Sequence, residues 1–205
     1  DPRMETFVSI LNASRLPTRV VLISTTGVYG DCRGEWVTED RPPNPQADRA
    51  RRRLAAETSL RRWSEKSGVP IVILRVPGIY GRGYLPEARL RAGEPVLREE
   101  ESPFSNRIHA DDLARVCFIA GHHANPGTLY NVSDGHPTTM TDFFYRVADV
   151  LGERSTRDLD NPFSPLYLLD AIGVSARAVY PASKLWRPLM ERLVADITPS
   201  ANKVY

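Results

Sequence analysis

Residues 20–30 read VVLISTTGVYG, four apolar residues followed by three hydroxyl-bearing residues and a loop hinged by two glycines. A short, β-branched apolar run bounded by turn residues is typical of a strand buried in a parallel sheet. Ligands bind open parallel sheets in the crevice beyond the carboxyl ends of the strands. The stretch therefore predicts a buried strand and, in the loop after it, side chains that contact a small molecule.

Length and composition limit the kinds of partner to expect. The chain has 205 residues, of which 41% are hydrophobic, enough for one domain with a sizeable core. Lys+Arg 27 against Asp+Glu 25 gives a net charge of +2, too small an excess to favour nucleic acid or an anionic membrane. We therefore expect a small-molecule partner.

The cysteines and the apolar runs bear on the compartment. Cys32 and Cys117 are far apart and lack metal-ligand spacing, which argues against a disulfide scaffold and a zinc site. No signal peptide opens the chain, and no apolar run approaches the ~18 residues of a membrane span. We expect a cytoplasmic protein without membrane contact.

Strand-like and helix-like segments alternate along most of the chain. The expected strands cover residues 18–24, 69–74 and 128–133, and the expected helices cover residues 4–13, 48–66, 111–120 and 143–151. Gly68 should end the second helix, Asp111 or Asp112 should cap the third, and Thr139 should cap the fourth. This alternation favours parallel βαβ units.

The fold class follows from that alternation. Residues 1–152 are predicted to form an α/β domain, part of a doubly wound parallel sheet. Residues 153–205 are predicted to add a small α-rich lobe with helices at 165–172 and 184–194. This tail contains no motif of known chemistry, so its role stays open.

Four short motifs follow one another in a fixed order. They are residues 24–30 (STTGVYG), 74–81 (LRVPGIYG), 107–114 (RIHADDLA) and 130–135 (YNVSDG). Together they resemble successive landmarks of the extended short-chain dehydrogenase/reductase superfamily, the NAD-dependent epimerase/dehydratase family. The resemblance implies a Rossmann-like sheet, NAD or NADP as the cofactor, and a small hydroxylated substrate such as a nucleotide-sugar.

The resemblance also implies roles for individual residues. The catalytic candidates are Thr25 and Tyr29, the cofactor-binding candidates are Ser24, Arg53, Pro77, Gly78 and Ile79, and the substrate-binding candidates are Thr26, Tyr80 and Arg107. A hydroxyl at the end of a strand, such as that of Thr25, can donate to a substrate oxygen. The alternatives are that the hydroxyls of residues 24–26 only satisfy the turn and that both tyrosines only pack.

The histidines are interpreted as structural. His109 precedes an acidic helix start and is expected to be hydrogen-bonded there. His122, His123 and His136 lack the cysteine or carboxylate neighbours of a metal site. We predict no metal.

The first departure from the family concerns the nucleotide-binding half of the sheet. The family holds the dinucleotide on a glycine-rich turn after its first strand, where backbone N–H groups meet the pyrophosphate. Gly27 and Gly30 do not make such a turn, and the motif order places residues 1–13 before the fifth strand of the family sheet. The strand at residues 18–24 would then be an edge that needs a partner. We expect a fragment of a longer polypeptide, or a homodimer or second chain that supplies the missing strands.

The second departure concerns the reaction itself. Family members with the standard mechanism carry Tyr-x-x-x-Lys, in which the lysine lowers the pKa of the phenol for proton transfer. Here Arg49 and Arg53 occupy those two positions. A guanidinium stays charged and cannot accept the proton, although Arg53 can still hydrogen-bond a ribose.

Two functional classes remain open. One is an oxidoreductase, epimerase or dehydratase with a non-standard active site, and the other is a catalytically silent NAD(P)-binding sensor or interaction protein. The arginines of the helix at residues 48–66 could also form a phosphate or nucleic-acid surface. Asp48, Glu57 and Glu65 on the same helix favour an ordinary solvated face.

Overall fold

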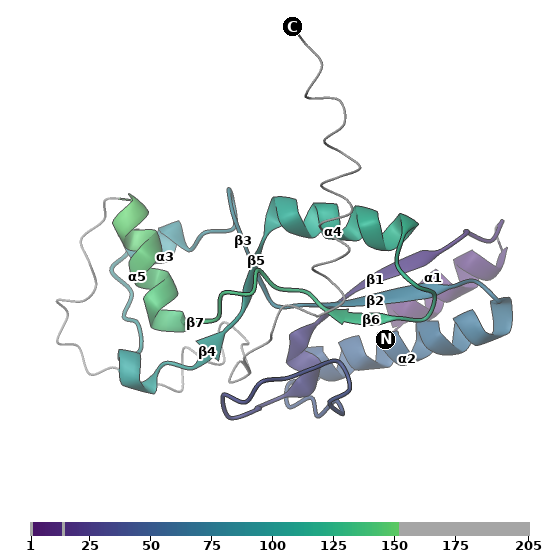
Figure 1. Ribbon diagram of the computed structural model, residues 1–205, viewed down its shortest axis with the longest axis horizontal. Helices are drawn as coiled ribbons and strands as arrows, with labels where there is room; N and C mark the ends of the chain where they lie inside the picture. Colours follow the sequence, from purple (N-terminus) through teal and green to yellow (C-terminus); the bar gives the residue numbers. More distant parts are fainter. Residues whose placement is uncertain (1, 14, 152–205) are drawn as a thin grey trace, which may run out of the picture.

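The computed structural model describes residues 2–13 and 15–151 and is built around a three-stranded parallel sheet (Figure 1). Its strands are β1 (Val20–Thr25), β2 (Ile71–Val76) and β6 (Leu129–Asn131), in the order β1-β2-β6. Thr25 lies opposite Val76, so β1 and β2 end at the same edge of the sheet. The predicted parallel arrangement is confirmed.

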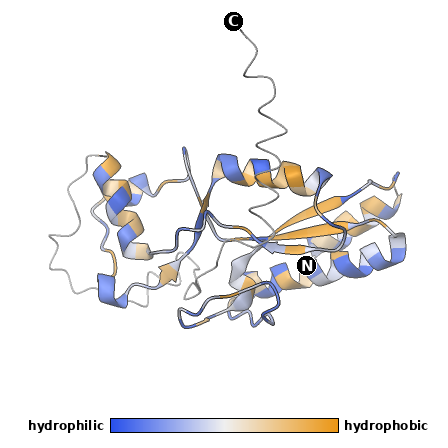
Figure 2. Cartoon of the chain, viewed as in Figure 1, coloured by the Kyte–Doolittle hydropathy of each residue, from blue (hydrophilic) through white to orange (hydrophobic). Residues whose placement is uncertain are grey.

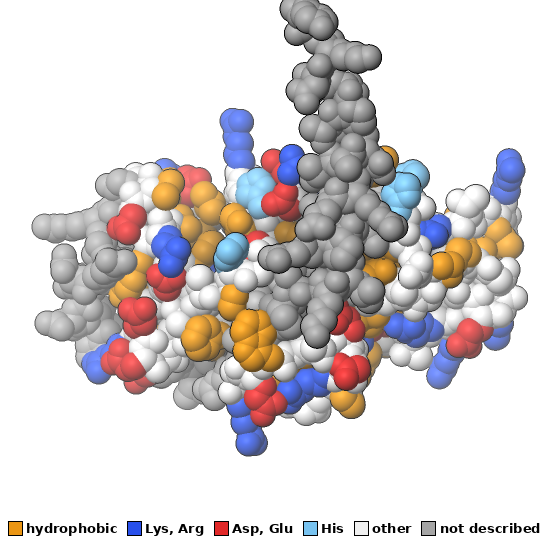
Figure 3. Space-filling view, in the orientation of Figure 1, with side chains coloured by type: hydrophobic (Ala, Val, Ile, Leu, Met, Phe, Trp, Pro, Cys, Tyr) orange, Lys and Arg blue, Asp and Glu red, His pale blue; other side chains and the backbone are white. Residues whose placement is uncertain are grey.

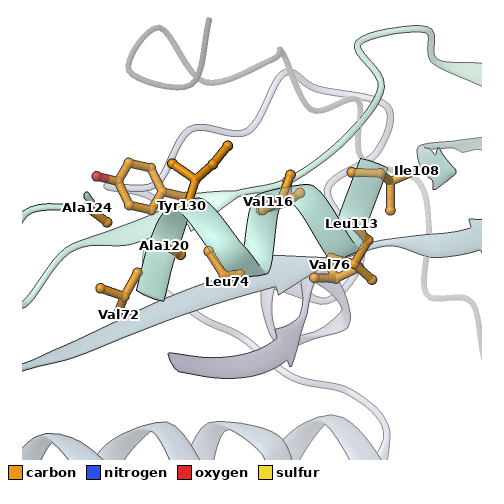
Figure 4. Packing of buried hydrophobic residues seen from close by; sticks show 11 residues of the cluster. Val72, Leu74, Val76, Ile108, Leu113, Val116, Ala120, Ala124 and Tyr130 are labelled. Atoms are coloured by element: carbon orange, nitrogen blue, oxygen red, sulfur yellow. The ribbon is translucent and has the colours of Figure 1, made fainter. Parts of the chain in front are cut away.

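Helices cover both faces of this sheet (Figure 1). Helices α1 (Pro2–Ala13) and α2 (Asp48–Ser67) lie on one face, and α4 (Ala110–His122) lies on the other. Because side chains alternate along a strand, Val72, Leu74 and Val76 pack against α4, whereas Ile71 and Ile73 face α1 and α2 (Figure 4). A strand buried on both faces must be apolar throughout, as β2 largely is in Figure 2.

The ends of α2 and β2 follow from local chemistry. Gly68 adopts φ 73° and donates its N–H to the carbonyl of Ser64 at 2.9 Å, so the predicted helix stop is confirmed. The strand expected at residues 69–74 instead runs from Ile71 to Val76. Pro70 has no N–H, and its carbonyl accepts from Val20 at 3.0 Å, so regular pairing begins one residue later.

The cap of α4 differs from the expectation. The prediction that Asp111 or Asp112 caps this helix is wrong, because the residue before its first turn is His109. The His109 Nδ1 accepts the backbone N–H of Asp111 at 3.3 Å, which confirms the hydrogen-bonded histidine, and Asp112 pairs with Arg115 instead. A helix begins where the backbone leaves the extended region, and here that occurs at Ala110, one residue before the first acid.

A smaller lobe lies beyond the carboxyl edge of the sheet, at the left of Figure 1. It contains β3 (Gly78–Tyr80), α3 (Glu87–Arg91), η2 (Glu99–Glu101), β4 (Phe104–Ser105), β5 (Arg107–His109), β7 (Thr138–Thr139) and α5 (Met140–Leu151). Strand β3 pairs with β5 in parallel, and β4 pairs with β7 antiparallel. Leu90, Phe144 and Val147 form part of its own apolar core. The helices expected at 165–172 and 184–194 lie outside the described residues.

Thr139 caps α5 as predicted, because its Oγ1 accepts the N–H of Asp142 at 3.0 Å. The helix begins at Met140, three residues earlier than expected, because residues 140–142 form its first turn.

Strand β1 is the edge of the sheet within the described residues, where it pairs with β2 alone. Its Ile23 side chain is 44% exposed although it belongs to the apolar run. No helix of residues 2–13 and 15–151 combines the length and the apolar character of a membrane span.

Candidate functional site

The turn after β1 holds the first group of candidate residues. It is a short 3-10 helix, η1 (Thr26–Tyr29), and the half-buried Thr25 stands before it. Thr25 Oγ1 accepts the N–H of Gly27 at 3.2 Å, so the hydroxyl does serve the turn. A hydroxyl that accepts one hydrogen bond keeps its own O–H to donate. Thr25 can therefore stabilise the turn and still donate to a ligand oxygen.

Ser24 faces the opposite side of β1, toward α2. Its buried Oγ donates to Oε1 of Glu57, and Arg75 donates to the same carboxylate through Nε at 3.2 Å and Nη2 at 2.7 Å. Burial alone would lower the pKa of Arg75, but its hydrogen bonds to Glu57 and the nearby negative charge outweigh burial and raise it. The ion pair thus ties the ends of β1 and β2 to the middle of α2.

Tyr29 completes the same buried network. Its side chain is 1% exposed, its hydroxyl donates to Asn131 Oδ1 at 2.9 Å, and the Arg75 guanidinium carbon lies 4.6 Å from its ring centre. Burial raises the pKa of Tyr29 despite the opposing charge of Arg75, so the hydroxyl is protonated at neutral pH. These contacts match the packing alternative.

Asn131 connects this network to the loop after η1. Its Nδ2 donates to the carbonyl of Val37 at 3.3 Å, and its backbone N–H donates to Glu39 Oε1 at 2.9 Å. The loop is therefore fixed across the end of β6, together with the ring of Tyr29.

Sequence reasoning assigned no role to Arg75 or Asn131, and it placed Glu57 on a solvated helix face, which is wrong because Glu57 is 2% exposed. A signal was present for Glu57 and Arg75, because Glu57 lies on the apolar side of a helix and Arg75 interrupts an apolar strand. Charged side chains are almost never buried without a partner, so two such misfits predict a pair.

The segment after β2 carries the candidates Pro77, Gly78 and Ile79. The N–H of Gly78 donates to the carbonyl of Asn106 at 3.3 Å, and both Gly78 and Ile79 are exposed. This short strand therefore runs along the surface past the edge of the sheet, with part of its backbone accessible to a ligand.

Arg107 and Tyr80 come together in a second group, around the ring of Phe143. The Arg107 guanidinium carbon lies 3.7 Å from the centre of the Phe143 ring, and its Nη1 donates to Ser105 Oγ at 2.6 Å. Burial lowers the pKa of Arg107 to about 10, so it is charged at neutral pH. Burial and the carboxylate of Asp134 raise the pKa of Tyr80, whose ring centre lies 6.4 Å from that of Phe143.

Arg49 and Arg53 lie exposed on the first turns of α2. In Figure 3, blue and red side chains are interspersed along the lower border of the view. This part of the surface therefore carries charges of both signs.

An open cleft of about 510 Å³ lies between the loop after η1 and the segment from η2 to β4. Arg33, Glu100, Glu101 and the exposed ring of Phe104 are among its lining residues. None of the residues selected from the sequence lines it. Within residues 2–13 and 15–151, three or more His, Cys, Asp or Glu side chains nowhere gather as metal ligands would.

Solved structures share this architecture. A functionally unknown conserved protein from Silicibacter pomeroyi DSS is 27% identical with a TM-score of 0.71, over 93% of this chain and 67% of that one. A dTDP-glucose 4,6-dehydratase from Bacillus anthracis str. Ames in complex with NAD is 16% identical with a TM-score of 0.72, over 92% of this chain and 60% of that one. The second likeness shows the fold alone. The predicted Rossmann-like α/β class is confirmed.

Relatives and a family model give the same assignment. A probable dTDP-glucose 4,6-dehydratase of Sinorhizobium fredii is 25% identical over 178 residues, which are 82% of this chain and 50% of that protein. An uncharacterized protein of the same organism is 27% identical over 79% of this chain and 43% of its own length, so the chain spans about half of each. The family model described as NAD dependent epimerase/dehydratase family matches residues 4–133. That match covers more than half of the chain and includes three of the four motifs, and the chain therefore belongs to the NAD-dependent epimerase/dehydratase family.

Proposed function

We propose that the protein is an NAD(P)-dependent epimerase, dehydratase or related oxidoreductase that acts on a small hydroxylated substrate such as a nucleotide-sugar. The observation that carries the proposal is the position of Thr25, whose hydroxyl stands at the carboxyl end of β1, opposite Val76 at the end of β2. Family membership supports the reaction class, and the dTDP-glucose dehydratases among the similar proteins support a nucleotide-sugar. The cysteine pattern supports a cytoplasmic setting.

The proposed roles follow the two groups of residues. Thr25 donates a hydrogen bond to the reacting oxygen of the substrate. Arg53 lies toward the cofactor, whereas Ser24 donates its buried hydroxyl to Glu57 and can support the cofactor site only through the position of β1. The exposed backbone of residues 77–79 offers hydrogen bonds to the carboxamide of the nicotinamide. Thr26, Tyr80 and Arg107 lie toward the substrate, where the arginine supplies positive charge.

Tyr29 is the candidate for proton transfer. The hydroxyl of Tyr29 is bonded to Asn131, so a catalytic role requires this bond to break when substrate binds. Its raised pKa disfavours the phenolate, and the residue four positions after Tyr29 is Arg33 rather than a lysine. Tyr29→Phe tests this role directly, because the variant keeps the ring and removes only the proton donor.

The residues fit the nicotinamide end of a dinucleotide better than its pyrophosphate. Residues 26–29 form a single short 3-10 helix, whereas a pyrophosphate site needs the N-terminus of a full helix. The bound cofactor would supply the hydride acceptor or donor. We propose that its phosphates are held by a strand and turn that pair with the edge of β1, from the same polypeptide or from a partner.

The second candidate function is an NAD(P)-binding sensor without catalysis. The observation that favours it is the replacement of the tyrosine and lysine by Arg49 and Arg53. Both candidates share ligand binding at the carboxyl edge of the sheet, and they differ in whether a proton and a hydride move there.

Binding and turnover separate the two candidates. NADH and NADPH are titrated into the full-length protein by fluorescence, and a panel of sugar nucleotides is then assayed for turnover. For an enzyme, Thr25→Val should lower kcat by about 10²-fold with binding retained, and Thr25→Ser should restore most of it. Binding without turnover of any sugar nucleotide supports the sensor, and failure to bind either dinucleotide contradicts both candidates.

A further inference from the structure

Arg107 lies at the carboxyl edge of the central sheet, in contact with the segments that follow β2 and β6. Gly78 comes two residues after the end of β2, and a Cβ placed on it would lie 3.5 Å from Cγ of Arg107. The carbonyl of Arg107 accepts the N–H of Asp134, three residues after the end of β6, at 2.8 Å. Because Thr25 lies opposite Val76 at the end of β2, Arg107 belongs to the same edge of the sheet as Thr25.

The guanidinium of Arg107 is buried without a counter-charge. Arg107 is 8% exposed, and no carboxylate of the described residues lies within 4.0 Å of its nitrogen atoms. Its Nη1 donates to Ser105 Oγ at 2.6 Å and to Thr138 Oγ1 at 3.3 Å, and its Nη2 donates to Met140 Sδ at 2.9 Å. These acceptors are neutral, and Nε donates to none of the residues that the structure describes. Charged side chains are almost never buried unpaired, so this arginine lacks a partner of opposite charge.

Two carboxylates act on Arg107 from a distance, but each is held by another side chain. Asp142 accepts from Nε of Arg146 at 2.8 Å, and Asp134 accepts from the hydroxyl of Tyr80. Both carboxylates raise the pKa of Arg107, and burial nevertheless lowers this pKa to about 10. The guanidinium therefore stays charged at neutral pH, although nothing that the structure describes neutralises it at close range.

A ligand can approach Arg107 at Gly78. Gly78 is exposed, and the position that its side chain would occupy lies against the stem of Arg107. Because glycine has no side chain, a ligand can come close to the backbone there and reach the arginine beside it. The ring of Phe143 covers one face of the guanidinium, with its centre 3.7 Å from the guanidinium carbon. An anion would therefore bind at the edge of the guanidinium, where the N–H groups lie.

We propose that Arg107 binds an anionic group of the substrate, a carboxylate or a phosphate, so that the protein selects negatively charged substrates. A guanidinium donates two parallel hydrogen bonds, which match the paired oxygens of either anion. The bound anion would supply the counter-charge that the described residues do not provide. The inference rests on the proposed function, since it names the substrate class of the same ligand edge.

The test compares ligands that differ by one anionic group, titrated by calorimetry into the full-length protein. UDP-glucuronate and UDP-glucose differ by a carboxylate, and UMP and uridine differ by a phosphate. In the wild type, the charged member of at least one pair should bind about tenfold more tightly, which is the effect of a charged hydrogen bond. Arg107→Met should abolish this preference and change the affinity for the neutral member less than about twofold.

Arg89→Met is the matched control. Arg89 also lies over a phenylalanine ring of α5, 5.2 Å from the centre of Phe144, but it pairs with Glu94 at 2.6 Å. Because its charge is already compensated, its removal should change the preference less than about twofold. The inference would be overturned if Arg89→Met and Arg107→Met lost the preference equally, or if Arg107→Met kept it. A wild type that binds charged and neutral ligands equally, or binds none of the four, would overturn it too.

A second variant keeps the inference testable if Arg107→Met does not fold, as its melting temperature would show. Arg107→Lys keeps a cation over Phe143 but loses the planar fork, so it should keep only part of the preference. A preference equal to that of the wild type would contradict anion binding by the guanidinium.

The two pairs of ligands identify the source of the anion. If Arg107→Met loses only the preference for UDP-glucuronate over UDP-glucose, Arg107 binds a sugar carboxylate. If it loses only the preference for UMP over uridine, Arg107 binds a phosphate. Equal weakening of the charged and neutral members of both pairs would show that Arg107 only shapes the site, and would reject the inference.

This inference and the proposed function can fail separately. If NADH binds and a sugar nucleotide is turned over while Arg107→Met keeps every preference, the role of Arg107 is wrong and the proposed function stands. If no dinucleotide binds while Arg107→Met loses the preference for an anionic ligand, the proposed function is wrong and the anion-binding role of Arg107 stands.

Discussion

Helix α2 contributes to two charged clusters that differ in almost every respect. The closed cluster comprises Ser24, Tyr29, Glu57, Arg75 and Asn131, all buried and bonded to one another. The open cluster comprises Thr25 at the end of β1 together with Arg49 and Arg53, which lie exposed on the first turns of the same helix. The closed cluster fixes the strand ends, whereas the open cluster contains residues that we propose to contact the ligand. The comparison teaches that the buried charges of α2 serve the framework, and that the residues proposed for ligand binding lie outside it.

The largest expected effect comes from breaking the ion pair of the closed cluster. Glu57→Ala leaves the buried guanidinium of Arg75 without its counter-charge and should lower the free energy of unfolding by about 3–5 kcal/mol. Urea denaturation, monitored by circular dichroism, measures this loss of unfolding free energy. Asp48→Ala, which breaks an exposed pair on the same helix, should cost less than about 1 kcal/mol.

A double variant keeps this prediction testable if Glu57→Ala does not fold. Replacing both partners, as Glu57→Met with Arg75→Met, removes the unpaired charge and should recover most of the lost stability, because apolar replacements of buried pairs are often neutral. A double variant as unstable as Glu57→Ala alone would show that the pair is not the main source of the effect.

The next effect concerns the link between the closed cluster and the loop after η1. Asn131→Ala removes the acceptor of the Tyr29 hydroxyl and the donor to Val37, which leaves buried polar groups unpaired. The expected loss is about 2–3 kcal/mol of unfolding free energy, with faster proteolysis in residues 31–47. If the loop is cleaved no faster than in the wild type, contacts other than Asn131 fix it.

A smaller effect is expected for Tyr29→Phe, which leaves the acceptor Asn131 Oδ1 unpaired. The variant should lose about 1–2 kcal/mol of unfolding free energy at pH 7. Its pH dependence has a defined sign, because the pKa of Tyr29 in the folded chain is raised above the ordinary value of 10.0. The wild type therefore loses the contribution of the Tyr29 hydroxyl as the pH rises past about 10, and Tyr29→Phe has no such contribution to lose. The unfolding free energies of the wild type and of Tyr29→Phe, measured at pH 9, 10 and 11, should approach one another as the pH rises. A difference between the two proteins that stays constant would contradict the raised pKa.

The parallel framework was predictable from the sequence because its signals are local. Apolar runs, helical spacing and the stop at Gly68 each involve neighbouring residues, and the four motifs then fixed the family. The cap at Thr139 could be predicted for the same reason, because it depends only on neighbouring residues. The limits of β2 were less accurate because they depend on pairing with β1 and on the missing N–H of Pro70.

The partners within the site could not be read from the sequence. The Tyr29 hydroxyl meets Asn131 across 102 residues, and Glu57 meets Arg75 across 18, so neither contact follows from local spacing. Burial of Ser24 and Tyr29 was likewise hidden, because it depends on how α2 packs against β1 and on how η1 lies against the end of β6.

The smallest effect on stability is expected in the open cluster, where the change in chemistry should be large. The double variant Arg49→Tyr with Arg53→Lys rebuilds the family pair on an exposed face and should change the unfolding free energy by no more than about 0.5 kcal/mol. The lysine would lower the pKa of the new phenol, so dinucleotide-dependent turnover should appear or rise. Arg49→Phe with Arg53→Lys controls for the hydroxyl. A loss above about 2 kcal/mol would place these arginines in the framework rather than at the ligand edge, and would remove the distinction between the two clusters.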